Sequence, residues 1–150
     1  MRIGELAHST ACPLDTIRFY EKQGLLPVPR RSPGNYRVYG SEHAERLAFI
    51  RRCRSLDMSL PEIRALLDAI ERPDADCAPV NALLDEHIGH VAERISELRR
   101  LKEELDAIRA HCKGSEPTKH CGILTSLVRP GSRGKGLRAH VRGTHGQRRS

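Results

Sequence analysis

The stretch from Val80 to Cys112 contains no proline, and its only glycine is Gly89. Such a run predicts one long helix. Apolar residues recur along it at steps of three and four: Leu84, Ile88, Val91, Ile95, Leu98, Leu101, Leu105, Ile108 and Cys112. This near-heptad spacing forms a stripe that needs a partner helix. Because no other segment is long enough to cover it, we predict a dimerisation helix in a homodimer.

The composition favours helices over a large globular core, since aromatic residues make up only 3% of the chain and tryptophan is absent. No stretch approaches the roughly 20 apolar residues of a membrane span, and the N-terminus lacks the layout of a signal peptide. We therefore expect a cytoplasmic protein without a membrane partner. In that compartment the five cysteines are expected to be free thiols or metal ligands.

The net charge of +7 is unevenly divided along the chain. Residues 1–54 hold ten basic and five acidic side chains. Residues 55–128 hold nine basic and fourteen acidic side chains, and residues 129–150 hold seven basic side chains and no acidic ones. The basic first part is therefore the expected contact for a polyanion such as DNA. The basic tail is predicted to be disordered.

The first 40 residues have the outline of a winged helix-turn-helix. A short helix is expected at Ile3–Ser9, and a second one opens at Pro13 and closes at Gly24. The sequence LPVPRRSPGNYRVYG follows, with three prolines and a Pro-Gly-Asn turn between β-prone residues, which predicts a hairpin or wing. Its arginines and tyrosines suit contact with phosphate, although a solvated loop is the simpler alternative.

Two further helices complete the predicted head. Ser41 is expected to cap the third helix, and Ser59 with Glu62 forms a capping box for the fourth. Cys12 and Cys53 are interpreted as structural thiols. The predicted organisation is a DNA-binding head at 1–70, a linker at 71–79, the dimerisation helix at 80–112, a metal-binding loop and short helix at 112–128, and the tail at 129–150.

These motifs occur together in a known family. The sequences IGELA, TIRFYEKQGLLP, GNYRVY and LAFIRRCRSLDMSLPEIRALL, in this order, resemble the MerR family of transcriptional regulators over residues 1–128. The segment PDADCAPVNALLDEHIGHV is most similar to its lead- and cadmium-responsive members. The resemblance implies a mainly α fold: a winged helix-turn-helix head, a long antiparallel coiled-coil helix and an effector loop. It departs from the family at ACPLD, before the second helix.

The resemblance also implies a DNA-binding surface. On the second helix Thr16, Arg18 and Tyr20 would face the DNA, and Arg18 suits a bidentate contact with guanine. The wing residues that would contribute are Arg31, Asn35, Tyr36, Arg37 and Tyr39. We interpret most of Arg51, Arg52 and Arg54 as a solvated helix face.

The effector loop HCKGSEPTKHC holds Cys112 and Cys121, and Cys77 precedes the long helix. Thiolates select soft or borderline metals, and a closed thiolate site needs at least three donors. Lys113 and Lys119 are expected to favour the thiolate form. Within one chain Cys77 and Cys112 would lie on the order of 50 Å apart, whereas an antiparallel partner would bring Cys77 beside the other two. The resemblance points to the same three ligands, and to lead(II) or cadmium(II) before zinc(II) or mercury(II).

A second, weaker metal site is a further hypothesis. His87 and His90 share one helix face, and Glu62, His140 and His145 are its other candidate ligands. The alternative is a polar helix face and an unstructured tail.

The predicted function is activation of metal-resistance genes by a DNA-bound homodimer that distorts promoter DNA for RNA polymerase. No catalytic constellation is present in the sequence, so we predict no enzyme activity. Two alternatives stay open: a metal-storage or metal-transfer protein, and a MerR-type sensor of a redox signal.

Overall fold

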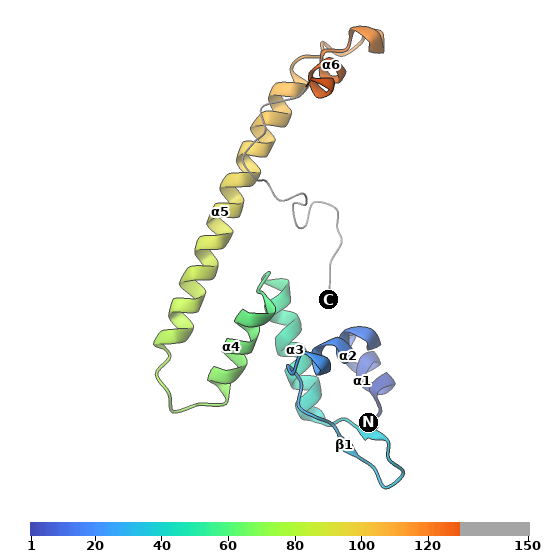
Figure 1. Ribbon diagram of the computed structural model, residues 1–150, viewed down its shortest axis with the longest axis vertical. Helices are drawn as coiled ribbons and strands as arrows, with labels where there is room; N and C mark the ends of the chain where they lie inside the picture. The colour runs from blue at the N-terminus through green and yellow to red at the C-terminus, as the bar shows by residue number, and fades with distance from the viewer. Residues whose placement is uncertain (130–150) are drawn as a thin grey trace. The chain divides into compact units, whose positions relative to one another are not determined.

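The computed structural model describes residues 1–129, and most of them are helical (Figure 1). His140 and His145 therefore lie outside the described residues. The elements are, in order, α1 (Ile3–Thr10), α2 (Leu14–Lys22), β1 (Arg30–Arg31), β2 (Arg37–Val38), α3 (Ser41–Ser55), α4 (Leu60–Ile70), α5 (Ala78–Arg109), the 3-10 turn η1 (Thr118–His120) and α6 (Gly122–Val128). The predicted mainly α fold with a winged helix-turn-helix is confirmed.

The helix-turn-helix consists of α1 and α2. Helix α1 ends where Ala11 turns into the left-handed region with φ 49°, and the Cys12 N–H donates back to the Ala7 carbonyl at 3.0 Å. Pro13 then precedes α2, and Gly24 ends it with φ 72°. Proline before the first turn and a left-handed glycine after the last turn are the predicted boundary signals.

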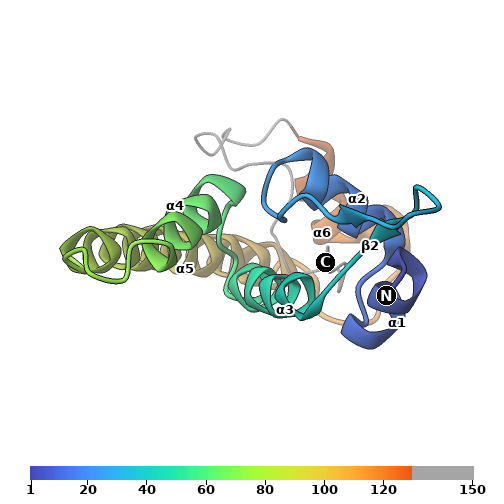
Figure 2. The same ribbon diagram turned by 90° about the horizontal axis from the view of Figure 1, so that it is seen from below.

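The wing is a short antiparallel hairpin in which Arg31 of β1 lies opposite Arg37 of β2. Its tip is closed by the Ser32 N–H, which donates to the Tyr36 carbonyl at 2.8 Å. Asn35 takes the left-handed conformation at the turn, with φ 64°. The hairpin projects from the helices of the head (Figures 1 and 2), so its exposed side chains are available to a ligand.

Helix α3 begins differently from the prediction that Ser41 caps it. Gly40 is the N-cap and Ser41 is the first helical residue. The Gly40 N–H is satisfied by the buried His43 side chain, whose Nδ1 accepts it at 3.0 Å, while His43 Nε2 lies 3.1 Å from the Pro27 carbonyl. An imidazole that reaches back from the third helical position thus replaces the expected serine hydroxyl. The capping box of α4 is confirmed, because Ser59 and Glu62 exchange two hydrogen bonds.

The core of the head is built where these helices meet. Its fully buried members come from α1, α2, α3, α4 and the connections between them: Leu6, Ile17, Tyr20, Leu25, Tyr39, Leu47, Ile50 and Ile63. Cys12 and Cys53 are buried in the same cluster, and burial raises the pKa of each thiol. Their interpretation as structural thiols is confirmed.

Two arginines join the end of α2 to α3 and α4. Arg46 of α3 donates through Nε to the Leu25 carbonyl at 2.9 Å, and its guanidinium pairs with Glu71, after α4, at 3.1 Å. Arg64 of α4 donates to the Gln23 carbonyl at 2.5 Å. Gln23 is the C-cap of α2, where carbonyls lack intrahelical donors, and Leu25 follows two residues later, so both contacts hold the end of α2 in the head.

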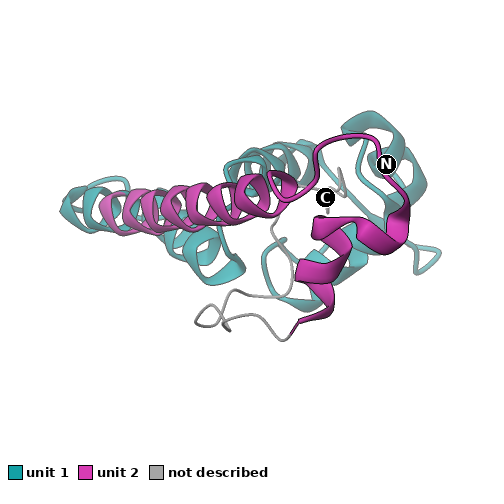
Figure 3. Ribbon diagram, turned by 90° about the horizontal axis from the view of Figure 1, so that it is seen from above, with its two compact units in different colours: residues 1–84, 149–150 teal, residues 85–148 magenta. Residues whose placement is uncertain are grey.

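Residues Met1–Leu84 form one compact unit, and a second unit begins at Asp85, so that α5 starts in the first and continues in the second (Figure 3). The helix has 32 residues, which at 1.5 Å per residue gives a length of roughly 48 Å. It ends at Arg109 rather than at the predicted Cys112. No helix in the described part of the chain is long and apolar enough to cross a membrane.

The apolar stripe of α5 remains open to solvent in the single chain. Ile88 is 60% exposed and Leu105 is 56% exposed. The stripe continues with exposed Val91, Ile95 and Leu98. A contiguous apolar surface of this kind is unusual on a monomer and marks an interaction site.

Candidate functional site

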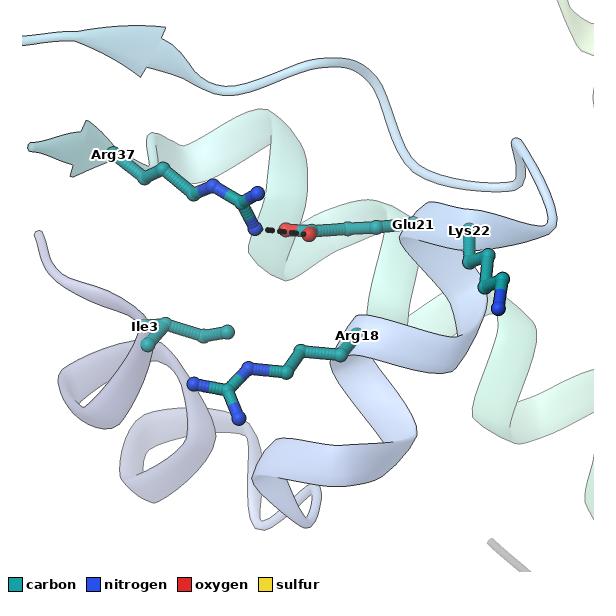
Figure 4. Close-up of a pocket in the computed structure, with 5 residues that line it drawn as sticks. All are labelled: Ile3, Arg18, Glu21, Lys22 and Arg37. Carbon is teal, nitrogen blue, oxygen red and sulfur yellow. Dashed lines mark hydrogen bonds and ion pairs between the residues drawn. The ribbon is translucent and has the colours of Figure 1, made fainter.

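The exposed face of α2 is basic. Arg18 and Lys22 are both exposed and lie one helical turn apart. They line a shallow cleft of about 600 Å³ with Ile3, Glu21 and Arg37. Figure 4 shows the Arg18 side chain extending from α2 toward Ile3 of α1. Thr16 of the same helix is half-buried, so Arg18 is the most accessible of the residues predicted on α2.

Two tyrosines that were predicted to face DNA are buried instead. Tyr20 and Tyr39 are each only 1% exposed, and their side chains belong to the core of the head. Burial is the main cause that raises the pKa of both hydroxyls. The prediction that they point toward DNA is therefore wrong for this chain. Tyr20 lies one turn from buried Ile17 on α2, a signal that the sequence did contain.

The other wing residues are exposed as predicted. Arg31, Asn35, Tyr36 and Arg37 all reach the surface of the hairpin. The Arg2 guanidinium lies 4.0 Å from the centre of the Tyr36 ring, which is a cation–π distance. This contact ties the tip of the wing to the start of α1.

Glu21 is a residue that the sequence analysis missed. It is an acid on the basic face, and its Oε2 accepts a hydrogen bond from Arg37 Nη1 at 3.1 Å. Its Oε1 accepts the hydroxyl of Tyr39. Glu21 therefore links α2 to the wing, and an acid within the basic segment TIRFYEK was the available signal.

The arginines near the end of α3 divide into two groups. Arg51 donates to the Thr10 carbonyl at the end of α1, and Arg54 donates to the Met58 carbonyl at 3.0 Å. Arg51 therefore has a structural role as a partner of a helix-end carbonyl, and Arg54 has one in the connection between α3 and α4. Arg52 is exposed, in keeping with a solvated face.

The second candidate site lies in the loop after α5. The Cys112 thiol is close enough to Cys121 to act on it as a hydrogen-bond partner, although eight residues separate the two along the chain. Gly114 allows the loop to turn, with φ 114°, and Pro117 precedes the 3-10 turn η1. The loop therefore places the thiols of Cys112 and Cys121 near each other, and their role as metal ligands stays a prediction.

Cys121 is set up to ionise. It is the N-cap residue of α6, although its sulfur makes no regular cap hydrogen bond, and the nearby backbone N–H of Leu124 is the first cause that holds the pKa of its thiol below the ordinary value. Desolvation opposes this effect, the N–H of Ile123 and the Cys112 thiol lower the pKa further, and the charge of Glu116 raises it. Backbone donors thus do what the sequence analysis attributed to Lys113 and Lys119. A thiolate is the form that binds metal, so this donor pair fits a soft ion.

Gly122 is the second residue that the sequence analysis missed. A Cβ built on it would lie 2.9 Å from the His111 Cβ, and closer still to the His111 carbonyl oxygen. The loop thus closes by direct backbone contact between its two ends. Only glycine permits this approach.

Replacing Gly122 with alanine is expected to force the loop ends apart at a cost of about 1–3 kcal/mol. Because Cys112 and Cys121 would separate, mild oxidation should form their disulfide at least several-fold more slowly than in the parent chain. Thiol titration against time after addition of oxidised glutathione measures this rate. Gly89→Ala is the matched control, since a Cβ there meets nothing within 4 Å. An unchanged rate in Gly122→Ala would contradict the described loop closure.

Cys77 lies at the other end of α5. It is exposed, and its carbonyl accepts the N–H groups of Val80 and Asn81 at 3.0 and 3.1 Å. In the sequence, the 32 residues of α5 lie between Cys77 and Cys112. Within residues 1–129 of the single chain, no three His, Cys, Asp or Glu side chains come together as a metal-binding group.

The second predicted metal site is not assembled by the described residues either. Glu62 is engaged in the capping box of α4, His87 is buried and His90 is exposed. This site stays a prediction, because two of its candidate ligands lie outside the described residues.

Comparison with known proteins identifies related sequences over both parts of the chain. Residues 1–70 match the model of the MerR HTH family regulatory protein, and residues 44–108 match a model described as MerR, DNA binding. The chain is 47% identical over 109 residues to the HTH-type transcriptional regulator ZntR homolog of Haemophilus influenzae, covering 73% of this chain and 81% of the relative.

Two solved structures are similar in fold and sequence. The transcription regulator PbrR691 from Ralstonia metallidurans CH34, in complex with lead(II), has a TM-score of 0.76 and 51% identity, over 85% of this chain and 98% of that one. The MerR regulator of Bacillus megaterium MB1, in complex with mercury(II), has a TM-score of 0.67 and 29% identity, over 86% and 100%.

Proposed function

Because the chain belongs to the MerR family of transcriptional regulators, which are not enzymes, we propose that it activates metal-resistance genes in response to lead(II) or cadmium(II). In this proposal a homodimer binds a promoter operator in the cytoplasm. Zinc(II) and mercury(II) are the other candidate inducers. The observation that carries the proposal is the pair of close thiols, Cys112 and Cys121, at one end of α5 with Cys77 at the other.

The exposed stripe of α5 supports an antiparallel homodimer. Burying an apolar side chain of this size stabilises by about 1.5–3 kcal/mol, and both copies contribute the same stripe. In the antiparallel arrangement the start of one α5 helix lies beside the end of the other. Cys77 of one protomer then meets Cys112 and Cys121 of its partner, and each dimer has two equivalent sites.

The donor set supports a soft or borderline divalent ion. Thiolate ligands select such metals, and hard ions such as magnesium prefer oxygen ligands. The 51% identity to a regulator whose structure contains lead(II) supports the same order of candidates. A bound ion would supply a fixed link between the ends of the two α5 helices.

The energetics of this switch are feasible. Moving a two-state equilibrium from 1:99 to 99:1 needs about 5.5 kcal/mol of differential affinity, and bending a 20–30 base-pair site costs about 1–6 kcal/mol. Structural zinc(II) in zinc-finger peptides, which include thiolate ligands, binds with apparent free energies of about 10–16 kcal/mol at neutral pH. A fraction of that energy suffices to drive a change in the dimer that distorts promoter DNA for RNA polymerase.

The head supports reading of a two-part operator. Arg18 on α2 is exposed and suits a guanine edge, while Arg31, Tyr36 and Arg37 on the wing suit phosphates. A dimer of such heads is expected to bind half-sites with two-fold symmetry.

The direct test combines DNA binding with transcription. An operator is selected from a random duplex pool with the purified protein, and transcription from a promoter that carries it is measured with lead, cadmium, zinc and mercury salts under a reductant. We expect specific binding with and without metal, and activation only with metal. A storage or transfer protein would select no operator. A redox sensor would respond to oxidant and not to metal under reducing conditions.

A further inference from the structure

Glu21 places a carboxylate on the surface that is proposed to face DNA. An unpaired carboxylate there would repel phosphates, so an acid in this position needs a specific partner. Its two oxygens are both used: Oε2 accepts from Arg37 Nη1 at 3.1 Å, and Oε1 accepts from the Tyr39 hydroxyl. Figure 4 shows the Arg37 guanidinium pointing from β2 toward this carboxylate on α2.

The two ends of this ion pair differ in their access to solvent. The Glu21 side chain is 14% exposed, whereas that of Arg37 is 49% exposed. A guanidinium has five N–H donors in a planar fork, so one hydrogen bond to Glu21 leaves the others for a further acceptor. The carboxylate is shielded while the open part of the guanidinium faces outward.

The second hydrogen bond of Glu21 fixes where this pair sits. Tyr39 follows β2 and is buried in the core, and its backbone N–H donates to the Met1 carbonyl at 2.7 Å. Glu21 is therefore held by a rigid residue at the base of the wing. Arg18, which is proposed to read bases, lies one turn before Glu21 on the same helix. Glu21 therefore sets the position of Arg37, which is proposed to bind phosphate, relative to Arg18.

We propose that Glu21 is a positioning residue for DNA binding: it orients the Arg37 guanidinium so that its free donors reach a DNA phosphate in register with Arg18. The inference rests on the proposed DNA-binding function. It predicts that removing the charge of Glu21 weakens DNA binding. Simple electrostatics predicts the opposite, because removing an acid from a basic surface should strengthen binding to a polyanion.

The Glu21→Gln variant distinguishes the positioning role from simple electrostatics. A glutamine can still bond to Tyr39 or to Arg37 through either end of its amide, but it is neutral, so the charge-assisted hydrogen bond that orients the Arg37 guanidinium is lost. We expect operator affinity to fall about fivefold and the slope of log K against log salt to lose about 1.8, because each of the two heads of the dimer loses one phosphate contact worth about 0.9. Glu45→Gln is the control, because Glu45 is an exposed acid on α3 and its neutralisation should leave binding unchanged or slightly tighter.

A double-mutant cycle tests whether Glu21 acts through Arg37. In an Arg37→Ala background, Glu21→Gln should change affinity less than about twofold, since coupled residues are not additive. Tyr39→Phe removes the hydrogen bond that holds Glu21 in place but leaves the carboxylate and its ion pair with Arg37, so it should lower the salt slope clearly less than Glu21→Gln does. A Tyr39→Phe slope that falls as in Glu21→Gln would assign the effect to wing folding and overturn the proposal.

The outcomes distinguish this inference from the proposed function. Failure of the parent protein to bind any selected operator would reject DNA binding itself. If the parent binds but Glu21→Gln binds as tightly as Glu45→Gln, or loses equal affinity with and without Arg37, only the positioning role is rejected. Fluorescence anisotropy of a labelled operator at several salt concentrations supplies every measurement.

Discussion

Replacing Cys112 with serine is expected to abolish metal-dependent activation and leave operator binding intact. Serine offers a hard, neutral oxygen where a soft thiolate is required, and Cys112 is one of the two donors that the loop brings together. Loss of supporting groups around a metal typically costs 10–100-fold in affinity. Loss of a primary ligand should therefore exceed about 100-fold.

The measurement for Cys112→Ser is competition for lead(II) or cadmium(II) against a chelator, with operator affinity in parallel. His120→Ala is the matched control, because His120 is an exposed neighbour of Cys121 in η1 and is not proposed as a ligand. It should keep metal affinity within a few-fold. Retained activation in Cys112→Ser, or equal losses in both variants, would contradict the three-thiol site.

The second large effect is expected in the apolar stripe of α5. Leu98→Glu would bury a carboxylate at the centre of the proposed coiled coil, and by two-fold symmetry each dimer would carry the change twice. Removing a core leucine alone costs about 2–5 kcal/mol. Dimer dissociation should therefore become at least about a thousandfold more favourable, and operator affinity should collapse because one head reads only half a site.

Sedimentation equilibrium measures this change directly. Ser96→Glu introduces the same charge at an exposed position that is outside the stripe, and it should remain dimeric. A Leu98→Glu protein that sediments as a dimer would place the interface elsewhere on the molecule.

Much of the fold could be predicted because its signals are local. The long helix shows a repeating stripe without an internal proline, and the wing contains three prolines beside a Gly-Asn turn, so both follow from periodicity and turn chemistry. The helix ended at Arg109 rather than at Cys112, because helix ends depend on the loop that follows. The prediction that Ser41 caps α3 was wrong, because the His43 side chain reaches back to the backbone N–H of Gly40.

The parts of the candidate sites that could not be predicted depend on contacts between distant residues. Burial of Tyr20 and Tyr39 requires the packing of several helices, and a tyrosine in sequence carries no mark of which way its hydroxyl points. The pairing of Glu21 with Arg37 and the contact of Gly122 with His111 join segments whose approach only the folded chain defines. The nearness of Cys112 and Cys121 could be predicted, because a short loop limits how far apart they can lie, whereas their role as ligands stays a prediction.

A heterodimer with complementary defects tests the shared-site account most directly. One protomer carries Cys77→Ser, and the other carries Cys112→Ser and Cys121→Ser. The two proteins are co-expressed with different affinity tags and purified through both. We predict that each homodimer binds no lead(II) tightly, and that the heterodimer binds one ion per dimer, because one complete set of thiols is restored. A heterodimer without tight binding, or a Cys77→Ser homodimer that binds like the parent, would contradict ligand sharing between subunits.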